Sequence, residues 1–199
     1  MSNLNKKRYG ILVIDMLYDF IHGELGSTNV KKIIPNINSL LEFARNANIP
    51  ILFCNDSHDS TDRQLEIWGP HAMKGTKGSQ VIPELKIQPN DYIVLKNTYS
   101  AFYKTDLKKI LDSLYSGKGV KSIIFTGIHT DICIQHSVYD AFLSGYNIII
   151  AEDGVSSLNI KKHNEGINYM KSNYSIQIQT IEKLLSDLNK NTIKNNDNK

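Results

Sequence analysis

Strand-length apolar runs alternate with segments of helical periodicity along this chain. The apolar runs cover residues 9–14, 50–54, 91–95, 123–126, 147–151 and 175–180. Helical spacing of apolar residues falls between them, at 35–47, 105–114 and 160–171, and a last helix is expected to end near Leu188. Such alternation predicts an α/β fold with a doubly wound, mainly parallel six-stranded sheet and helices on both faces.

The length and composition fit one globular domain. With 199 residues, of which 41% are apolar, the chain can bury a full core, and we expect a single domain over residues 1–188. The polar residues 189–199 are expected to form a disordered tail. Cys54 and Cys133 are far apart, and no secretory or membrane-spanning run is visible, so we expect reduced thiols and a cytoplasmic protein.

The net charge of +3 is small, and the lysines are spread along the chain rather than gathered with aromatic residues. Nucleic acid is therefore not an expected partner, and a membrane surface is not expected either.

Cys133 follows a buried strand and the glycine turn at Gly127, and it opens a predicted helix. Backbone N–H groups and the positive end of the helix dipole favour a thiolate at such a position. We therefore expect Cys133 to act as a nucleophile at neutral pH.

Two charged residues come directly after other apolar strands. Asp15 ends the first run, where it either takes part in chemistry or caps a turn. Lys96 ends the third run, where it either needs an anionic partner or extends its ammonium to solvent at the sheet edge. Because parallel strands end at one edge of the sheet, Asp15, Lys96 and Cys133 are expected to meet there.

Together these three side chains suit hydrolysis of an amide through a thioester. The carboxylate can take the thiol proton and pass it to the leaving amine, while the lysine stabilises negative charge. Backbone N–H groups of the turn before the helix can bind the developing oxyanion. The alternative pairs Cys133 with His136 or His129 as a thiol and histidine hydrolase, which leaves Asp15 and Lys96 without a role.

The polar segment from residue 55 to 90 is too long for a routine connection, which indicates a functional loop. It carries Asp56, His58 and His71, a carboxylate and two imidazoles that suit Zn²⁺ or another first-row metal. The alternative is that both histidines are solvated or hydrogen-bonded only.

In combination, these motifs resemble the isochorismatase-like cysteine hydrolases, and within them the nicotinamidases or pyrazinamidases. The resemblance spans roughly residues 8–180. Four motifs carry the resemblance. The first is the strand that ends in Asp15, followed by Phe20, and the second is residues 56–58 together with residues 68–71 and Gly75. The third is Lys96 with residues 99–102, and the fourth is residues 126–133.

The resemblance implies the isochorismatase-like three-layer fold and specific roles. Cys133 becomes the nucleophile, Asp15 the general base and acid, and Lys96 the third catalytic member. The backbone N–H groups of His129 and Cys133 would form the oxyanion hole beside a cis peptide between Ile128 and His129. Phe20, Trp68 and Tyr103 would pack around the substrate ring, and Asp56, His58 and His71 would bind a divalent metal that holds the pyridine nitrogen.

The implied activity is hydrolysis of nicotinamide to nicotinate and ammonia, as in NAD salvage, by a homo-oligomer. Zn²⁺ is the first choice of metal, with Fe²⁺ or Mn²⁺ as alternatives. The fourth ligand is left open among Gln64, Glu66 and water, because several nicotinamidases have an acidic residue where this chain has Gln64. Many relatives also have a small residue in place of His129, whose imidazole is expected to narrow or polarise the pocket.

Two other functions stay open. One is a metal-independent amidohydrolase of the same family that acts on a carbamoyl or ureido compound. The other is a non-catalytic member of the fold. A true isochorismatase is disfavoured because those relatives lack the cysteine nucleophile that Cys133 would supply.

Overall fold

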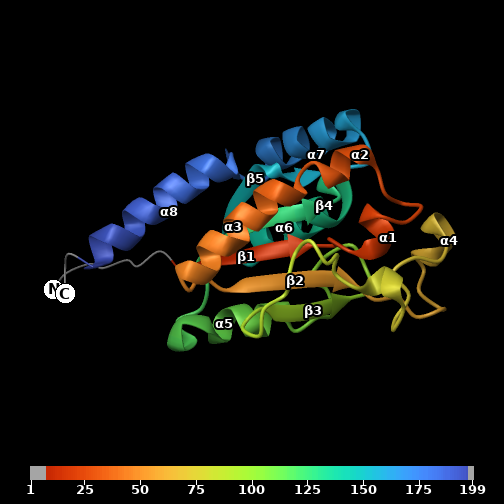
Figure 1. Cartoon of the computed structure of the whole chain (residues 1–199), viewed down its shortest axis with the longest axis horizontal. Helices are drawn as coiled ribbons and strands as arrows, with labels where there is room; N and C mark the ends of the chain where they lie inside the picture. Colours follow the sequence, from red (N-terminus) through yellow and green to blue (C-terminus); the bar gives the residue numbers. More distant parts are fainter. Residues whose placement is uncertain (1–7, 197–199) are drawn as a thin grey trace.

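The computed structural model describes residues 8–196, with side chains as far as residue 189. Its centre is one sheet of six parallel strands in the order β3-β2-β1-β4-β5-β6 (Figure 1). The predicted fold class is therefore confirmed. The strands are β1 (Tyr9–Ile14), β2 (Ile51–Asp56), β3 (Tyr92–Lys96), β4 (Ser122–Ile128), β5 (Asn147–Ser156) and β6 (Gln177–Gln179).

The expected helices are present, and several short ones join them. The long helices are α3 (Ile34–Asn46), α5 (Leu107–Gly117), α6 (Gln135–Leu143), α7 (Ile160–Asn173) and α8 (Ile181–Asn196). The sequence did not predict α1 (Tyr18–Ile21), α2 (Thr28–Lys31), α4 (Leu65–Trp68) or the 3₁₀ turn Lys77–Ser79. These single turns are too short to display a helical period.

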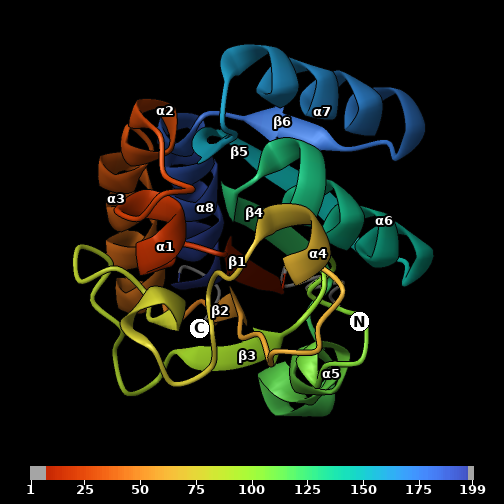
Figure 2. The same cartoon turned by 90° about the vertical axis from the view of Figure 1, so that its right-hand side faces the viewer.

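Alternate residues of each central strand face opposite layers of helices. In β1, Ile11 and Val13 pack in the cluster that includes Leu40 of α3 and Leu184 of α8. Leu12 belongs to the opposite cluster, with residues of α5, α6 and α7. All three β1 side chains are fully buried. Figure 2 looks along the sheet and shows α3 and α8 on one side and α6 on the other. This is the expected three-layer arrangement, with a core on each face of the sheet.

The strand order creates a crevice beside β1. The chain moves outward from β1 to β2 and β3, and then returns to place β4 on the other side of β1. The connection after β1 leads to α3 on one face, while that after β4 leads to α6 on the other face. Connections that diverge in this way leave room for a ligand at the carboxyl ends of the two strands.

Gly127 allows β4 to approach the end of β1 closely. Its φ is 103°, a conformation that side chains disfavour, and a Cβ atom here would lie 2.0 Å from the carbonyl oxygen of Ile14. A glycine is therefore required immediately beside Asp15.

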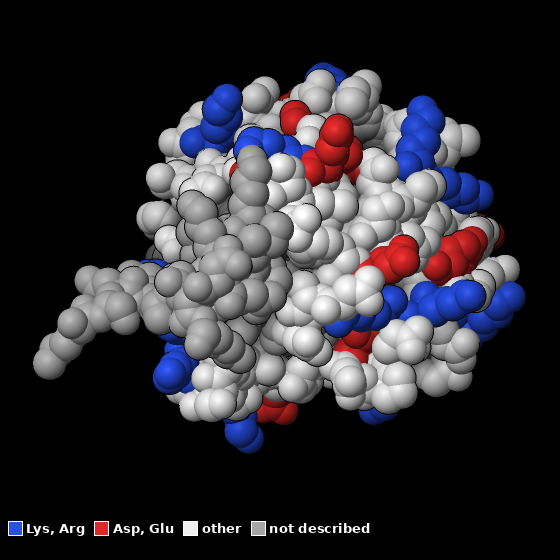
Figure 3. Space-filling model, turned by 60° about the vertical axis from the view of Figure 1, so that its left-hand side comes forward, with Lys and Arg blue, Asp and Glu red and all other residues white. Residues whose placement is uncertain are grey.

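The last helix is longer than expected. The backbone is helical to Asn196 rather than to Leu188, so the proposed tail begins inside α8, and residues 197–199 lie outside the described part. The division into a domain and a tail stays a prediction. Within the described residues, no helix combines the length and apolar character needed to cross a membrane. On the face in Figure 3, acidic and basic side chains are interspersed.

Candidate active site

Four strand ends bring together the three predicted catalytic residues and Asp56, which was predicted as a metal ligand. Asp15 directly follows β1, Asp56 is the last residue of β2, and Lys96 is the last residue of β3. Cys133 lies in the helical turn Thr130–Ile134, directly after β4. All four are buried, with at most 6% of any one exposed. The register of the sheet, which pairs Asp56 with Lys96, places these remote residues in one cluster.

Lys96 is the centre of this cluster. Its Nζ lies 2.7 Å from Oδ2 of Asp15 and 2.5 Å from Oδ1 of Asp56, and it donates to the carbonyl of Thr98 at 3.2 Å. Burial disfavours the ammonium, but the two carboxylates outweigh it and raise the pKa of Lys96 well above its usual value. The side chain is therefore a fixed cation, and the alternative of a lysine extended to solvent does not apply.

The Cys133 thiol lies beside this cation but is not a thiolate at rest. Its Sγ is 3.8 Å from Lys96 Nζ. Burial raises the pKa of Cys133 well above its usual value despite Lys96, and Asp15 and Asp56 add to the rise. The expectation of a thiolate held by the helix terminus is therefore wrong, because that argument omitted burial. A base must remove the proton.

Asp15 is placed to be that base. A carboxylate oxygen of Asp15 lies within 4.8 Å of the thiol sulfur, and Oδ1 of Asp15 accepts the N–H of Asp56 at 2.8 Å. Burial and the neighbouring Asp56 raise the pKa of Asp15 to about 6, although Lys96 opposes the rise. A carboxyl with a pKa near neutrality can both accept and return a proton.

The peptide between Ile128 and His129 is cis, as expected. It precedes the turn that carries Cys133. The His129 side chain is 9% exposed, and burial lowers its pKa to about 4, so its imidazole is neutral at pH 7. Its Nδ1 is buried without a hydrogen-bond partner. The oxyanion hole assigned to the N–H groups of His129 and Cys133 stays a prediction.

The three predicted metal ligands lie together next to the cluster. One ligand atom from each of Asp56, His58 and His71 lies within 4.8 Å of the others, and all three residues are buried. Oδ1 of Asp56 is held by Lys96, while Oδ2 faces Nε2 of His58 at 3.5 Å. A carboxylate oxygen and two imidazole nitrogens match the donors that Zn²⁺ takes in proteins.

Hydrogen bonds fix which nitrogen each histidine can offer. Nδ1 of His58 lies 3.2 Å from Oδ2 of Asp62, and Nδ1 of His71 lies 2.7 Å from the carbonyl of Gly69. Because these oxygens only accept, each Nδ1 carries a proton, and in the neutral form of each ring Nε2 carries the lone pair that a metal would bind. Nε2 of His58 is buried without a hydrogen-bond partner, so these residues fit a cation that would satisfy it.

The two protein candidates for a fourth ligand differ in position. Gln64 is 8% exposed and lines the same pocket as Asp56 and His71. Glu66 is exposed on α4 and does not line it. The structure therefore brings Gln64, and not Glu66, to the pocket that Asp56 and His71 line.

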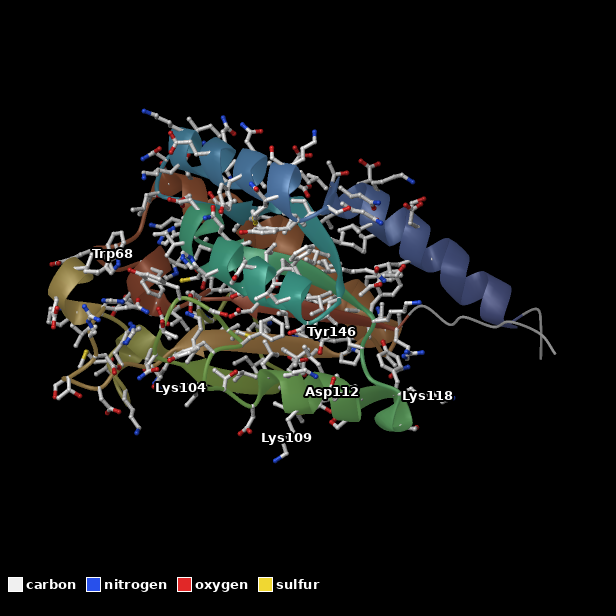
Figure 4. The ribbon with its side chains drawn as sticks, turned by 180° about the vertical axis from the view of Figure 1, so that it is seen from behind. Trp68, Lys104, Lys109, Asp112, Lys118 and Tyr146 are labelled. Carbon is white, nitrogen blue, oxygen red and sulfur yellow. The ribbon has the colours of Figure 1, made fainter. Side chains whose placement is uncertain are left out.

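Aromatic and aliphatic side chains form the remaining walls. Phe20 lies 5.4 Å from the His71 ring and 6.1 Å from the His129 ring, between centroids. Trp68 closes the pocket from α4, at the opposite end of the molecule from Lys118 (Figure 4). Sequence reasoning missed other lining residues, namely Leu25, Tyr99, Ile132 and Leu158.

Tyr103 is not brought to the pocket. Its side chain is 55% exposed and is absent from the lining. Tyr99 lines the pocket instead, and its hydroxyl accepts a hydrogen bond from Nε1 of Trp68 at 3.2 Å. His136 also lies elsewhere, with its Nδ1 donating to the carbonyl of Ile132 at 2.8 Å. Asp15, which has a carboxylate oxygen within 4.8 Å of the thiol sulfur, is placed to serve the thiol.

The fold and the cluster of thiol, carboxyl and ammonium define a cysteine hydrolase on a parallel α/β sheet. The chain belongs to the isochorismatase family: the model of the isochorismatase domain matches residues 9–182. Its relatives include amidohydrolases, and this protein is an amidohydrolase of that family.

Three relatives illustrate the range of the family. Nicotinamidase 3 of Arabidopsis thaliana is 33% identical over 80% of this chain and 78% of its own length. N-carbamoylsarcosine amidase of Thermoplasma acidophilum is 33% identical, with a TM-score of 0.81 over 87% of this chain and 96% of that one. The pyrazinamidase of Pyrococcus horikoshii, solved in complex with zinc, is 26% identical, with a TM-score of 0.76 over 87% of this chain and 99% of that one.

Proposed function

We propose that this protein is a nicotinamidase that hydrolyses nicotinamide to nicotinate and ammonia, as in NAD salvage. The observation that carries the proposal is one pocket bordered by Cys133 and Asp15, by the potential metal ligands Asp56 and His71, and by apolar walls that include Phe20. A flat, neutral ring with a carboxamide on one carbon and a ring nitrogen on another suits such a pocket.

In the first half of the reaction, Asp15 accepts the thiol proton as Sγ of Cys133 bonds to the carboxamide carbon. The carbonyl π electrons move to oxygen, where backbone N–H groups of the cysteine turn would stabilise the anion. The oxyanion electrons then re-form the carbonyl as the carbon–nitrogen bond breaks, and Asp15 gives its proton to the leaving nitrogen. Ammonia departs, and a thioester to Cys133 remains.

In the second half, Asp15 takes a proton from water as the water oxygen bonds to the thioester carbon. The carbon–sulfur bond breaks, and the thiolate recovers the proton from Asp15. Lys96 stays protonated throughout, because the pKa of its ammonium is raised by the carboxylates around it. Its charge stabilises the sulfur anion in both halves.

A divalent metal held by Asp56, His58 and His71 would supply a Lewis acid that binds the ring nitrogen of the substrate. Zn²⁺ is our first choice because of the donor set and the zinc bound by the pyrazinamidase relative, with Fe²⁺ or Mn²⁺ as alternatives. Gln64 or water would complete the coordination.

A second candidate is an amidase for a carbamoyl or ureido compound, which the likeness to N-carbamoylsarcosine amidase favours. Carbamoylsarcosine carries a carboxylate, which requires a cationic partner when it is buried. None of the lining residues in the described part of the chain is lysine or arginine, and Lys96 is already engaged by two carboxylates. The pocket therefore favours a neutral aromatic amide.

The test is ammonia release from nicotinamide, pyrazinamide, N-carbamoylsarcosine and ureidoacrylate by the purified protein. We expect nicotinamide to give the highest kcat/KM and Cys133→Ala to abolish its turnover. Preference for either carboxylate-bearing substrate would favour the second candidate, and undiminished turnover by Cys133→Ala would exclude the thiol mechanism. No turnover of any amide would favour a non-catalytic role. A cytoplasmic location, a homo-oligomeric state and the lack of nucleic-acid or membrane partners stay predictions.

A further inference from the structure

Asp62 joins a potential metal ligand to the strand that carries Lys96. It lies outside the pocket lining, in the turn between β2 and α4, and its side chain is 14% exposed. Oδ2 accepts from Nδ1 of His58 at 3.2 Å and from the N–H of Asp59 at 2.9 Å. Oδ1 accepts from Nδ2 of Asn97 at 2.9 Å. Both carboxylate oxygens are therefore occupied by donors.

We propose that Asp62 is a positioning residue that orients His58 and fixes its tautomer for divalent-metal binding. This inference rests on the metal site of the proposed function. The His58 side chain is fully buried, so a wrong tautomer would place an N–H where the metal needs a lone pair. An acidic partner on the distal nitrogen both prevents this and makes the imidazole a stronger ligand.

Asn97 holds the Asp62 carboxylate in place by donating a hydrogen bond to it. It directly follows Lys96, so the Asn97 amide anchors Asp62 to the end of β3. The metal-binding turn and the Lys96 cluster are then held at a fixed separation by a chain of three side chains: Asn97, Asp62 and His58. An asparagine at position 62 offers one acceptor and one donor, so it cannot accept from both His58 and Asn97.

The experiment measures Zn²⁺ affinity directly, by competition of the metal-free protein with a chromogenic chelator. We expect Asp62→Asn and Asp62→Ala to weaken binding by about 10-fold to 100-fold. The double variant Asp62→Asn with Asn97→Asp restores a matched donor and acceptor pair and should regain much of the affinity. Asp59→Asn removes the same charge from an exposed position three residues away, and it should bind like the unchanged protein.

Thermal unfolding of each metal-free variant separates loss of the site from loss of the fold. If folded Asp62→Asn and Asp62→Ala both bind Zn²⁺ as tightly as the unchanged protein, the role of Asp62 is overturned while the proposed function stands. If the unchanged protein binds no Zn²⁺, both the role of Asp62 and the metal part of the function are overturned. If Asp59→Asn weakens binding as much as Asp62→Asn, charge rather than the hydrogen bond is responsible, which also overturns the proposal.

Discussion

The Lys96 ammonium lies 2.7 Å from Asp15 in a fully buried ion pair, and Asp56 shares the same cation. We expect Lys96→Met to lower the free energy of unfolding at pH 7 by about 3–5 kcal/mol, because it leaves two carboxylates buried without a cation. Urea unfolding measures this, and the loss should shrink at pH 5 as those carboxylates become protonated.

The matched control is Lys108→Met. Lys108 pairs with Asp112 at 2.6 Å, but both side chains are more than half exposed, so its loss should cost less than about 1 kcal/mol. Equal losses in the two variants would contradict a structural role for the buried cation.

The pH dependence of catalysis should follow Asp15. Because burial raises the pKa of Asp15 to about 6, the base is protonated and inactive below that pH. We expect kcat/KM for nicotinamide to rise with pH through about 6. It should then stay level through neutral pH, because the pKa values of Cys133 and Lys96 both lie well above their usual ranges. A rate profile with its acid limb near 4 would contradict a buried base.

The effect of metal removal on activity should depend on which amide is the substrate. A chelator should lower kcat/KM for nicotinamide by more than about tenfold if Asp56, His58 and His71 hold a metal that binds the ring nitrogen. Benzamide has the same shape without that nitrogen, so any residual turnover of benzamide should change far less. Equal sensitivity of the two amides would show that the metal acts on structure rather than on the ring nitrogen.

His129 should set the size of substrate that the pocket accepts. The neutral imidazole fills space 6.1 Å from the Phe20 ring, while the backbone N–H assigned to the oxyanion hole survives substitution. We expect His129→Ala to raise the kcat/KM ratio of a ring-methylated nicotinamide over nicotinamide by about tenfold or more. Steady-state ammonia release for both amides measures it. An unchanged ratio would place the imidazole outside the substrate contact.

Gly127→Ala should be among the most damaging small substitutions. The added Cβ would meet the Ile14 carbonyl oxygen at 2.0 Å in a backbone conformation with positive φ, and we expect a loss above about 3 kcal/mol in urea unfolding. Gly145→Ala is the control, since Gly145 also has positive φ but nothing lies within 4 Å of its Cβ position. That variant should lose only about 1–2 kcal/mol. Similar losses would mean that φ alone accounts for the requirement.

The sequence predicted the sheet and the convergence of Asp15, Lys96 and Cys133 well, because strand-length apolar runs define the strands and parallel strands end at one edge. Contacts made by loop residues were harder to predict. Tyr103 was selected in place of Tyr99, since periodicity says nothing about which tyrosine of an irregular segment turns inward. The state of the Cys133 thiol was mispredicted because a local helix argument cannot include burial by distant strands.

Asp62 illustrates what spacing could have indicated. It lies four residues after His58, a distance at which an acid and a histidine within a turn can meet. Nothing in the sequence distinguishes it from Asp59 as the partner, because that choice depends on where Asn97 arrives from the other side of the turn.

The reacting groups come from the ends of four separate strands, and the register of those strands brings them within reach of one another. A nascent chain that has released only β1 to β3 contains Asp15, Asp56 and Lys96 but not the nucleophile Cys133, so it has no reactive centre. Catalysis is thus a property of the finished sheet, and ammonia release can report completion of folding during refolding or cell-free synthesis. Thermal inactivation should coincide with cooperative unfolding of the sheet.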